Sequence, residues 1–316
     1  MKSFVYIHPR AQNTNHIWAI RQECQSVIGL TKKPFKFFKL FFLTRRVLNI
    51  VLGANFDRVG IIILILALFR PHRYILQISD DRSNLIHKMC LKQLLKKGAR
   101  IAFVTHHVKK RVSEMLALEP EVGGVVFHGS DVLQIWKDRL PPPVEARYYD
   151  VLFFGRLNGE RGIFDFFEMA RRLPEFRFAV AGKRFRQPDV VKIAASIKNL
   201  DYLGWIESPE EKVHLMSNSK LLFSGMKGTE NFGISILEAL KSGCMVSCPL
   251  DYGPLAILKS EGHPFLRPKH IPLDGVIKHV KGLIEAPIIV KFESDQFEFE
   301  SIRSEWKNLM KEAKFG

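Results

Sequence analysis

Short apolar runs typical of β-strands alternate with helical patterns along the chain. Parallel strands cannot be joined by tight turns and need crossover connections, which are usually helices. The alternation therefore predicts α/β architecture with parallel sheets. The expected strands cover residues 3–8, 73–78, 99–105, 124–128, 150–154, 176–182, 200–206, 220–224 and 245–248.

A proline tract, Leu140-Pro-Pro-Pro-Val144, interrupts this pattern near the middle of the chain. Consecutive prolines favour a stiff, extended connection, and 316 residues are enough for two domains of ordinary size. We therefore expect one domain over residues 1–140 and a second over residues 146–290. The final stretch, which contains Trp306 and Met310, is typical of a helix.

The bulk composition is that of a folded soluble protein, with 47% apolar and 25% charged residues. The four cysteines are scattered and lack zinc-ligand spacing, so they support neither a metal site nor a disulfide framework. No signal peptide is recognisable at the N-terminus, which makes the cytoplasm the expected compartment.

Residues 228–248 form the most informative stretch. Small and polar residues lead into a helical pattern of Ile234, Leu237 and Leu240, and Gly243 stands where a helix C-cap glycine belongs. Residues 245–248 then predict a strand. Phe232-Gly233 thus lies at a helix N-terminus, where backbone N–H groups and the helix dipole favour an anion.

Two carboxylates, Glu230 and Glu238, bracket this helix start. A rise of 1.5 Å per residue puts them ~12 Å apart, and any loop before the helix lengthens that distance. A glycosidase acid/base pair needs roughly 5 to 9.5 Å, so the two cannot act on one bond. The spacing suits a long ligand held at both ends, with an anionic centre between them.

A glycine loop follows the predicted strand 150–154 and contains Gly155, Arg156, Arg161 and Gly162. Glycines between a strand and a helix let the backbone approach a phosphate group. Two arginines five positions apart can flank a diphosphate. This loop therefore predicts a second part of the same anion site.

These residues resemble the donor site of the family 4 retaining glycosyltransferases (glycosyl transferases group 1). The likeness rests on Glu230, seven residues and Glu238, with Asn231-Phe-Gly233 after the first Glu and Glu238-Ala-Leu-Lys-Ser-Gly-Cys244 at the end. It also rests on Arg156 and Arg161, although the family usually has Lys at the second position. The resemblance is close over residues 150–260 and only topological over residues 1–140.

The resemblance implies the GT-B fold, in which two Rossmann-like domains face each other across a cleft. Residues 1–140 are then the acceptor-side domain, completed by the C-terminal helix 295–316, and residues 146–290 bind the donor. Glu230 faces the donor sugar, Glu238 the ribose, and the backbone from Gly204 through Trp205 to Ile206 the base. Arg156, Arg161 and residues 231–233 (Asn231, Phe232, Gly233) stabilise the leaving diphosphate. No metal or cofactor is required, and a UDP-sugar is favoured over a GDP-sugar.

Asp80 marks a departure from the family. It follows the strand ending at Ile78, where these enzymes usually carry a histidine that reaches the donor sugar. An ionised Asp only accepts hydrogen bonds, so Asp80 is either a base or acceptor on the sugar side or simply the cap of the next helix. His8, His106 and Gly129 to Asp131 also follow strands and are further candidates.

Positive charge is concentrated in the first part of the chain. Residues 1–140 hold 23 Lys/Arg against 9 Asp/Glu, a net +14 of the total +16. Residues 31–46 interleave six basic residues with five phenylalanines, which favours a segment at an anionic membrane surface over a core helix or a nucleic-acid site. The apolar run 59–69 is too short to span a bilayer, which needs ~20 residues, and is expected to be buried.

The expected function is transfer of a sugar from a nucleotide-sugar donor to a glycan or glycolipid acceptor with retention at the anomeric carbon. Its setting would be cell-surface polysaccharide synthesis, with the protein held peripherally on the inner face of the membrane. A non-catalytic sugar-nucleotide-binding or membrane scaffold protein on the same fold is the alternative.

Overall fold

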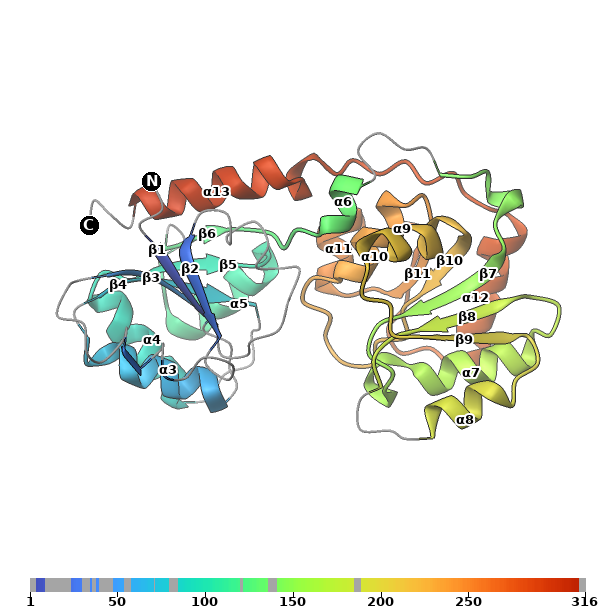
Figure 1. The fold of residues 1–316 in the computed structure, drawn as a ribbon, viewed down its shortest axis with the longest axis horizontal. Helices are drawn as coiled ribbons and strands as arrows, with labels where there is room; N and C mark the ends of the chain where they lie inside the picture. Colours follow the sequence, from blue (N-terminus) through green and yellow to red (C-terminus); the bar gives the residue numbers. More distant parts are fainter. Residues whose placement is uncertain are drawn as a thin grey trace. The chain divides into compact units, whose positions relative to one another are not determined.

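The computed structural model describes residues 4–8, 24–29, 35, 38–39, 48–53, 58–70, 72–79, 85–119, 122–135, 141–184 and 189–312. The chain divides into two compact units, residues 1–129 with 295–316, and residues 130–294. Each unit holds a six-stranded sheet, and the recorded strand pairs are parallel (Figure 1). The prediction of two α/β domains with parallel sheets is confirmed.

The first sheet has the strand order β2-β1-β3-β4-β5-β6. Strands β2 and β3 were not predicted from the sequence. The strands of this unit are β1 Phe4–His8, β2 Cys24–Gly29, β3 Asn49–Gly53, β4 Arg73–Ile78, β5 Arg100–Phe103 and β6 Gly124–Val125. Its helical elements are α3 Arg58–Leu68, α4 Leu85–Lys96, α5 His106–Leu116, η5 Asp295–Phe297 and α13 Phe299–Glu312.

The C-terminal helix α13 is part of the first unit's core. Side chains alternate across a strand, and one face of the sheet presents Tyr6, Val51 and Ile75 to Trp306 and Leu309 of α13. Figure 1 shows α13 over one face of this sheet and α3 and α4 over the other. The sheet is therefore covered on both faces, as a parallel sheet requires.

Helix α3 contains the apolar run that was expected to be buried. Ile63, Leu64 and Ala67 are inaccessible to solvent, but Ile62 and Ile65 are 52% and 38% exposed. The expectation of a buried element holds for only one side of the helix, because α3 lies in the outer layer of the unit. Among the residues that the structure describes, no helix is long and apolar enough to cross a membrane.

The second sheet has the order β12-β11-β10-β7-β8-β9. Its strands are β7 Tyr149–Phe154, β8 Phe178–Ala181, β9 Leu200–Gly204, β10 Ser219–Phe223, β11 Met245–Pro249 and β12 Leu266–Arg267. The helical elements are α6 Asp131–Ile135, η3 Val144–Ala146, η4 Gly159–Arg161, α7 Ile163–Arg172, α8 Val190–Ala195, α9 Pro209–Ser217, α10 Ile234–Lys241, α11 Tyr252–Leu258 and α12 Leu273–Glu285.

The division between the units falls at Gly129/Ser130, before the boundary predicted at the proline tract. The prolines are fixed on the second unit by Arg147, whose guanidinium donates to the carbonyl of Pro142 and, at 2.7 Å, to that of Gly243. Burial lowers the pKa of this arginine. Upstream of the prolines, α6 packs on α9 through Val132 and Val213. The predicted linker is therefore a packed part of the second unit.

The packing of α13 gives a stability prediction. Replacing Trp306, which is 1% exposed, by Ala should destabilise the first unit by about 3–5 kcal/mol, because the cavity left in the core cannot fully collapse. Trp205→Ala is the matched control, since Trp205 is 52% exposed and its loss leaves no cavity. Urea unfolding of both variants measures the difference, and equal losses would contradict the packing role of α13.

Candidate functional site

The order in which strands are added to the second sheet reverses between the neighbouring strands β7 and β10. From β7 the chain adds β8 and β9 on one side, and it then returns to add β10, β11 and β12 on the other. In parallel sheets ligands bind beyond the carboxyl ends of the strands at such a switch point. The loops that leave these two strands, 155–162 after β7 and 224–233 after β10, carry most of the predicted donor-site residues.

Glycines allow the loop after β7 to lie tightly against its neighbours. Gly155 has φ 146°, and a Cβ on Gly182 would lie 1.7 Å from the carbonyl oxygen of Gly155. A Cβ on Gly162, which has φ 77°, would lie 2.4 Å from the carbonyl oxygen of Gly225 in the loop after β10. Only glycine fits this position, so the two loops are in direct backbone contact.

The loop after β7 also orients Arg161. The side chain of Asn158 caps the short helix η4 by accepting the backbone N–H of Arg161 at 3.0 Å. The backbone N–H of Lys227 donates to the carbonyl of Glu160 at 2.9 Å, which joins the two loops a second time. Arg156, one residue after Gly155, is exposed.

Arg161 and Glu230 form an ion pair between the guanidinium and the carboxylate. Both side chains are partly buried, with 28% of Arg161 and 15% of Glu230 exposed. A guanidinium has five N–H donors, so Arg161 retains donors for a second anion while it holds Glu230. The structure thus brings together two of the predicted residues, one from each loop.

Asp251 fixes the backbone of Glu230. Its carboxylate accepts the backbone N–H of Glu230 at 2.8 Å, caps α11 through the N–H of Tyr252 and pairs with Lys269 at 2.9 Å. Two residues on, the N–H of Gly253 donates to the carbonyl of Glu230 at 2.8 Å. The loop is therefore held by both of its backbone groups at Glu230.

Helix α10 begins just after this loop. Gly233 adopts φ 90° at the N-cap and makes no side-chain cap, while Phe232 is buried and Asn231 is partly buried. The helix spans 234–241 and Gly243 adopts φ 70°, so the predicted helix and its terminating glycine are confirmed. Uncapped N–H groups at the start of a helix suit an anion.

Glu238 lies on the buried side of α10 and is 2% exposed. Its Oε1 accepts the hydroxyl proton of Ser130 at 2.5 Å. Ser130 belongs to the second unit.

The loop after β9 carries the residues predicted to lie near a base. Gly204 adopts φ 73°, Trp205 is half exposed and Ile206 is partly buried. The carbonyl of Gly204 accepts the N–H of Gly182 at 2.7 Å, and Gly182 lies against Gly155. These glycines line up along the same sheet edge.

Most of the candidate residues that precede the second unit lie outside the described residues. Asp80 and the side chain of His8 lie outside the described residues, and so does most of the segment 31–46. His106 begins α5, is exposed and packs edge-on against Phe127 with ring centroids 6.0 Å apart. Asp131 belongs to the second unit, where it begins α6 and accepts the backbone N–H of Val132 at 3.1 Å. Asp80 thus remains a prediction.

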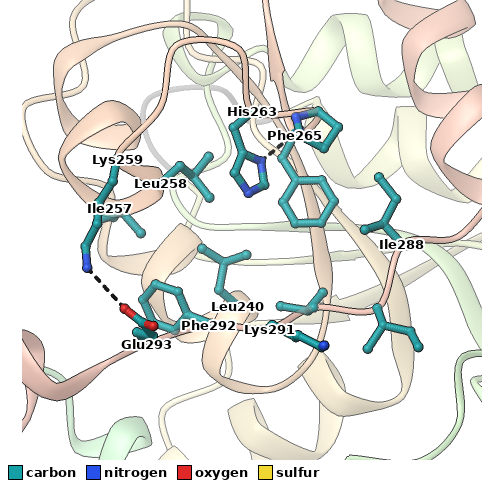
Figure 2. A pocket seen from close by; sticks show the side chains of 13 residues that line it. Leu240, Ile257, Leu258, Lys259, His263, Phe265, Ile288, Lys291, Phe292 and Glu293 are labelled. Carbon is teal, nitrogen blue, oxygen red and sulfur yellow. Dashed lines mark hydrogen bonds and ion pairs between the residues drawn. The ribbon is translucent and has the colours of Figure 1, made fainter.

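A pocket of about 400 Å³ lies elsewhere in the second unit (Figure 2). Its lining includes the apolar residues Leu240, Ile257, Phe265 and Ile288 and the ion pair between Lys259 and Glu293. None of the predicted site residues lines this pocket. Leu240 is near the end of α10, whereas the predicted anion site is at its start, so we place the functional site at the sheet edge.

The cysteines and histidines of the described part of the chain offer no evident metal centre. No group of three or more His, Cys, Asp or Glu side chains suited to a metal ion occurs there. Burial raises the pKa of both Cys244 and Cys248 to about 12, so neither is a thiolate at neutral pH.

Comparison with known proteins agrees with this geometry. Residues 134–285, just under half of the chain, match the family "Glycosyl transferases group 1", and this region lies inside the second unit. The resemblance of the donor half to group 1 glycosyltransferases is therefore confirmed. No curated protein sequence matches the chain.

Several solved structures share the whole fold. HepE from Anabaena in complex with UDP has a TM-score of 0.74 at 13% identity, covering 98% of this chain and 100% of that chain. A glycosyltransferase from Rickettsia africae ESF-5 gives 0.70 at 12%, covering 99% of both chains. The lipopolysaccharide outer core galactosyltransferase WaaB in its apo form gives 0.66 at 15%, covering 98% and 99%. At these identities the likeness establishes the fold, which is that of GT-B glycosyltransferases.

Sequence reasoning missed the contacts that support the site. Asp251 could have been recognised as a helix cap, because Asp is among the preferred N-cap residues. Its bond to Glu230 has no such signal, since 21 positions separate the two residues. The same holds for Ser130 and Glu238, which are 108 positions apart.

Gly253 provides a test of this support. A Cβ there would lie 2.5 Å from both the carbonyl oxygen of Glu230 and the backbone nitrogen of Phe232. Gly253→Ala should therefore displace the loop and cost roughly 1–3 kcal/mol through overpacking. Gly282→Ala is the control, because nothing lies within 4 Å of its Cβ and alanine favours helix α12. Thermal melting of both separates the effects, and equal melting temperatures would contradict the close approach.

Proposed function

We propose that this protein is a retaining glycosyltransferase, which moves a sugar from a nucleotide-sugar donor to a glycan or glycolipid acceptor. The observation that carries the proposal is the pairing of Arg161 with Glu230 at the switch point of the second sheet, beside the start of α10. The match of residues 134–285 to group 1 glycosyltransferases supports it.

The reaction breaks the bond between the anomeric carbon and the diphosphate oxygen, and the diphosphate leaves with the bonding electrons. The acceptor hydroxyl oxygen forms the new bond to the anomeric carbon and loses its proton. A site that stabilises this growing negative charge accelerates the step. Arg156, Arg161 and the N–H groups at the start of α10 supply positive potential at one end of the sheet. The proposed mechanism uses these protein groups and no metal ion.

The remaining roles follow the length of the donor. Glu230 contacts the sugar hydroxyls. Arg161 holds Glu230 through their ion pair and also bonds to the diphosphate. Glu238 accepts from the ribose hydroxyls. The backbone from Gly204 to Ile206 borders the base. The acceptor hydroxyl loses its proton to Asp80 or to the leaving phosphate itself.

We favour a UDP-sugar as donor. HepE of the same fold was crystallised with UDP and with UDP-glucose. A thermal-shift panel of UDP-, GDP- and ADP-sugars tests the choice. A ligand at 100 times its Kd should add about 2.7 kcal/mol of stability. Stabilisation by none of the three would contradict a nucleotide-sugar site.

Catalysis is tested by release of free UDP from a UDP-sugar when membrane glycolipid is added. Binding without any release over a range of acceptors would favour the non-catalytic alternative, a sugar-nucleotide-binding or scaffold protein. Asp80→Asn then locates the acceptor base, because loss of a general base should lower turnover roughly 10²-fold or more.

Substitutions of Glu230 and Glu238 should have different effects on UDP binding and turnover. Glu238→Ala should weaken UDP binding roughly tenfold or more, because hydrogen bonds to a charged group are worth about 1.5–3 kcal/mol. Glu230→Gln should leave UDP affinity nearly unchanged, since Arg161 remains available to the diphosphate, and should lower turnover. Calorimetry with UDP measures both.

Glu238→Gln and Ser130→Ala keep the helix packed and serve as controls for folding. Glu238→Gln should weaken UDP binding without a large fall in melting temperature. Equal loss of UDP affinity in the Glu230 and Glu238 variants would overturn the assignment of the two residues to opposite ends of the donor.

We place the reaction in cell-surface polysaccharide synthesis, on the inner face of the membrane. The net +14 of residues 1–140 favours an anionic surface. The protein should co-sediment with anionic vesicles and not with neutral ones. The binding should weaken as salt rises, because exposed charges are screened over about 8 Å at physiological ionic strength. Equal binding to both kinds of vesicle would contradict an electrostatic contribution.

A further inference from the structure

Helix α3 is unusual for an outer-layer helix, because its own side chains are apolar on all sides. After Arg58 its sequence is Val-Gly-Ile-Ile-Ile-Leu-Ile-Leu-Ala-Leu, with no charged side chain. A helix that is apolar all round is normally buried. Here Ile62 and Ile65 are exposed, and Phe69, just beyond the helix end, is 79% exposed. These three positions recur at helical spacing, so they lie on one side of α3.

Helix α4 packs beside α3 and extends the apolar surface. Leu85, Ile86 and Met89 in its first half are 50–72% exposed. We name the exposed side chains of both helices the α3–α4 face, and they are Ile62, Ile65, Phe69, Leu85, Ile86 and Met89. Figure 1 shows the two helices side by side on the side of the first sheet away from α13. An exposed apolar surface of this kind on a folded protein marks a contact site.

Lysines border the α3–α4 face. The helices run in the same direction, because both connect adjacent parallel strands, and Lys97 of the turn after α4 donates to the carbonyl of Leu68 at the end of α3. Lys92 and Lys96, both exposed, therefore lie level with the second half of α3. Between residues 82 and 113 the chain has nine Lys or Arg and no acidic residue.

We propose that the α3–α4 face is the surface by which this protein docks on anionic lipid, its apolar side chains entering the boundary between headgroups and acyl chains. The inference deepens the proposed membrane association and rests on it. The described residues 58–70 and 85–113 contain no carboxylate, and apolar side chains flanked by lysines are the pattern of an interfacial helix. A second copy fits less well, because a two-fold contact through this face would oppose its own lysines.

A matched pair of single substitutions tests the proposal. Phe69 on the face and Ile289 in the second unit are equally exposed, at 79% and 78%. Phe69→Ser should weaken sedimentation with vesicles of mixed phosphatidylserine and phosphatidylcholine by about tenfold, the cost of withdrawing one large apolar side chain from lipid. Ile289→Ser should bind as the parent does. A Leu85/Met89→Ser variant should bind vesicles about as weakly as Phe69→Ser does. A Lys92/Lys96→Glu variant should also bind more weakly than the parent, and the difference should be larger at low salt than at high salt.

UDP binding and melting temperature are measured on the same variants, and both should stay at the parent values because every altered side chain is exposed. If Phe69→Ser and Leu85/Met89→Ser both bind vesicles as well as the parent protein does, the docking role of the α3–α4 face is overturned, and membrane association must use another segment. Parent protein that ignores anionic vesicles would overturn the face together with membrane association, and retained UDP release would then leave sugar transfer standing. A parent dimer dissociated by Phe69→Ser would assign the face to a second copy.

Discussion

The second unit depends on close backbone approach between loops at the carboxyl edge of its sheet. Gly162 lies against Gly225, Gly182 against Gly155, and Gly253 against the backbone of Glu230 and Phe232. A Cβ at Gly162, Gly182 or Gly253 would lie 2.4, 1.7 and 2.5 Å, respectively, from the nearest backbone atom of the neighbouring loop, so a side chain at any of the three would force the loops apart. The loops after β7 and β10 can therefore meet, and Arg161 can reach Glu230. Backbone contact of this kind sets the geometry of the site before any charged side chain contributes.

Asp251 converts this contact into a fixed position for Glu230. A buried carboxylate is costly unless its oxygens are satisfied, and here two backbone N–H groups and Lys269 satisfy them. The same group caps α11 and restrains the loop that precedes α10. Stability and site geometry are thus provided by one side chain, which explains why a residue outside the expected donor contacts matters for the proposed chemistry.

The first unit shows a different arrangement. Its core depends on a helix from the far end of the chain, since Trp306 and Leu309 of α13 cover the face of the sheet formed by Tyr6, Val51 and Ile75. The opposite face is covered by helices whose outer side is apolar and bordered by lysines. Helices on both sides bury the two apolar faces of the sheet. The exposed apolar surface on the outer side of α3 and α4 is then available for contact outside the unit.

Local sequence determined much of this protein. The alternation of strands and helices, the limits of α10, the glycine after it and the loop from Gly155 to Gly162 follow from residue spacing and backbone preference, which act over a few positions. Three features were decided only by tertiary structure. They are the position of the unit boundary, the bonds from Asp251 to Glu230 and from Ser130 to Glu238, and the exposure of one side of α3. Each depends on which distant segments pack together, and an apolar or acidic residue carries no local signal that names its partner.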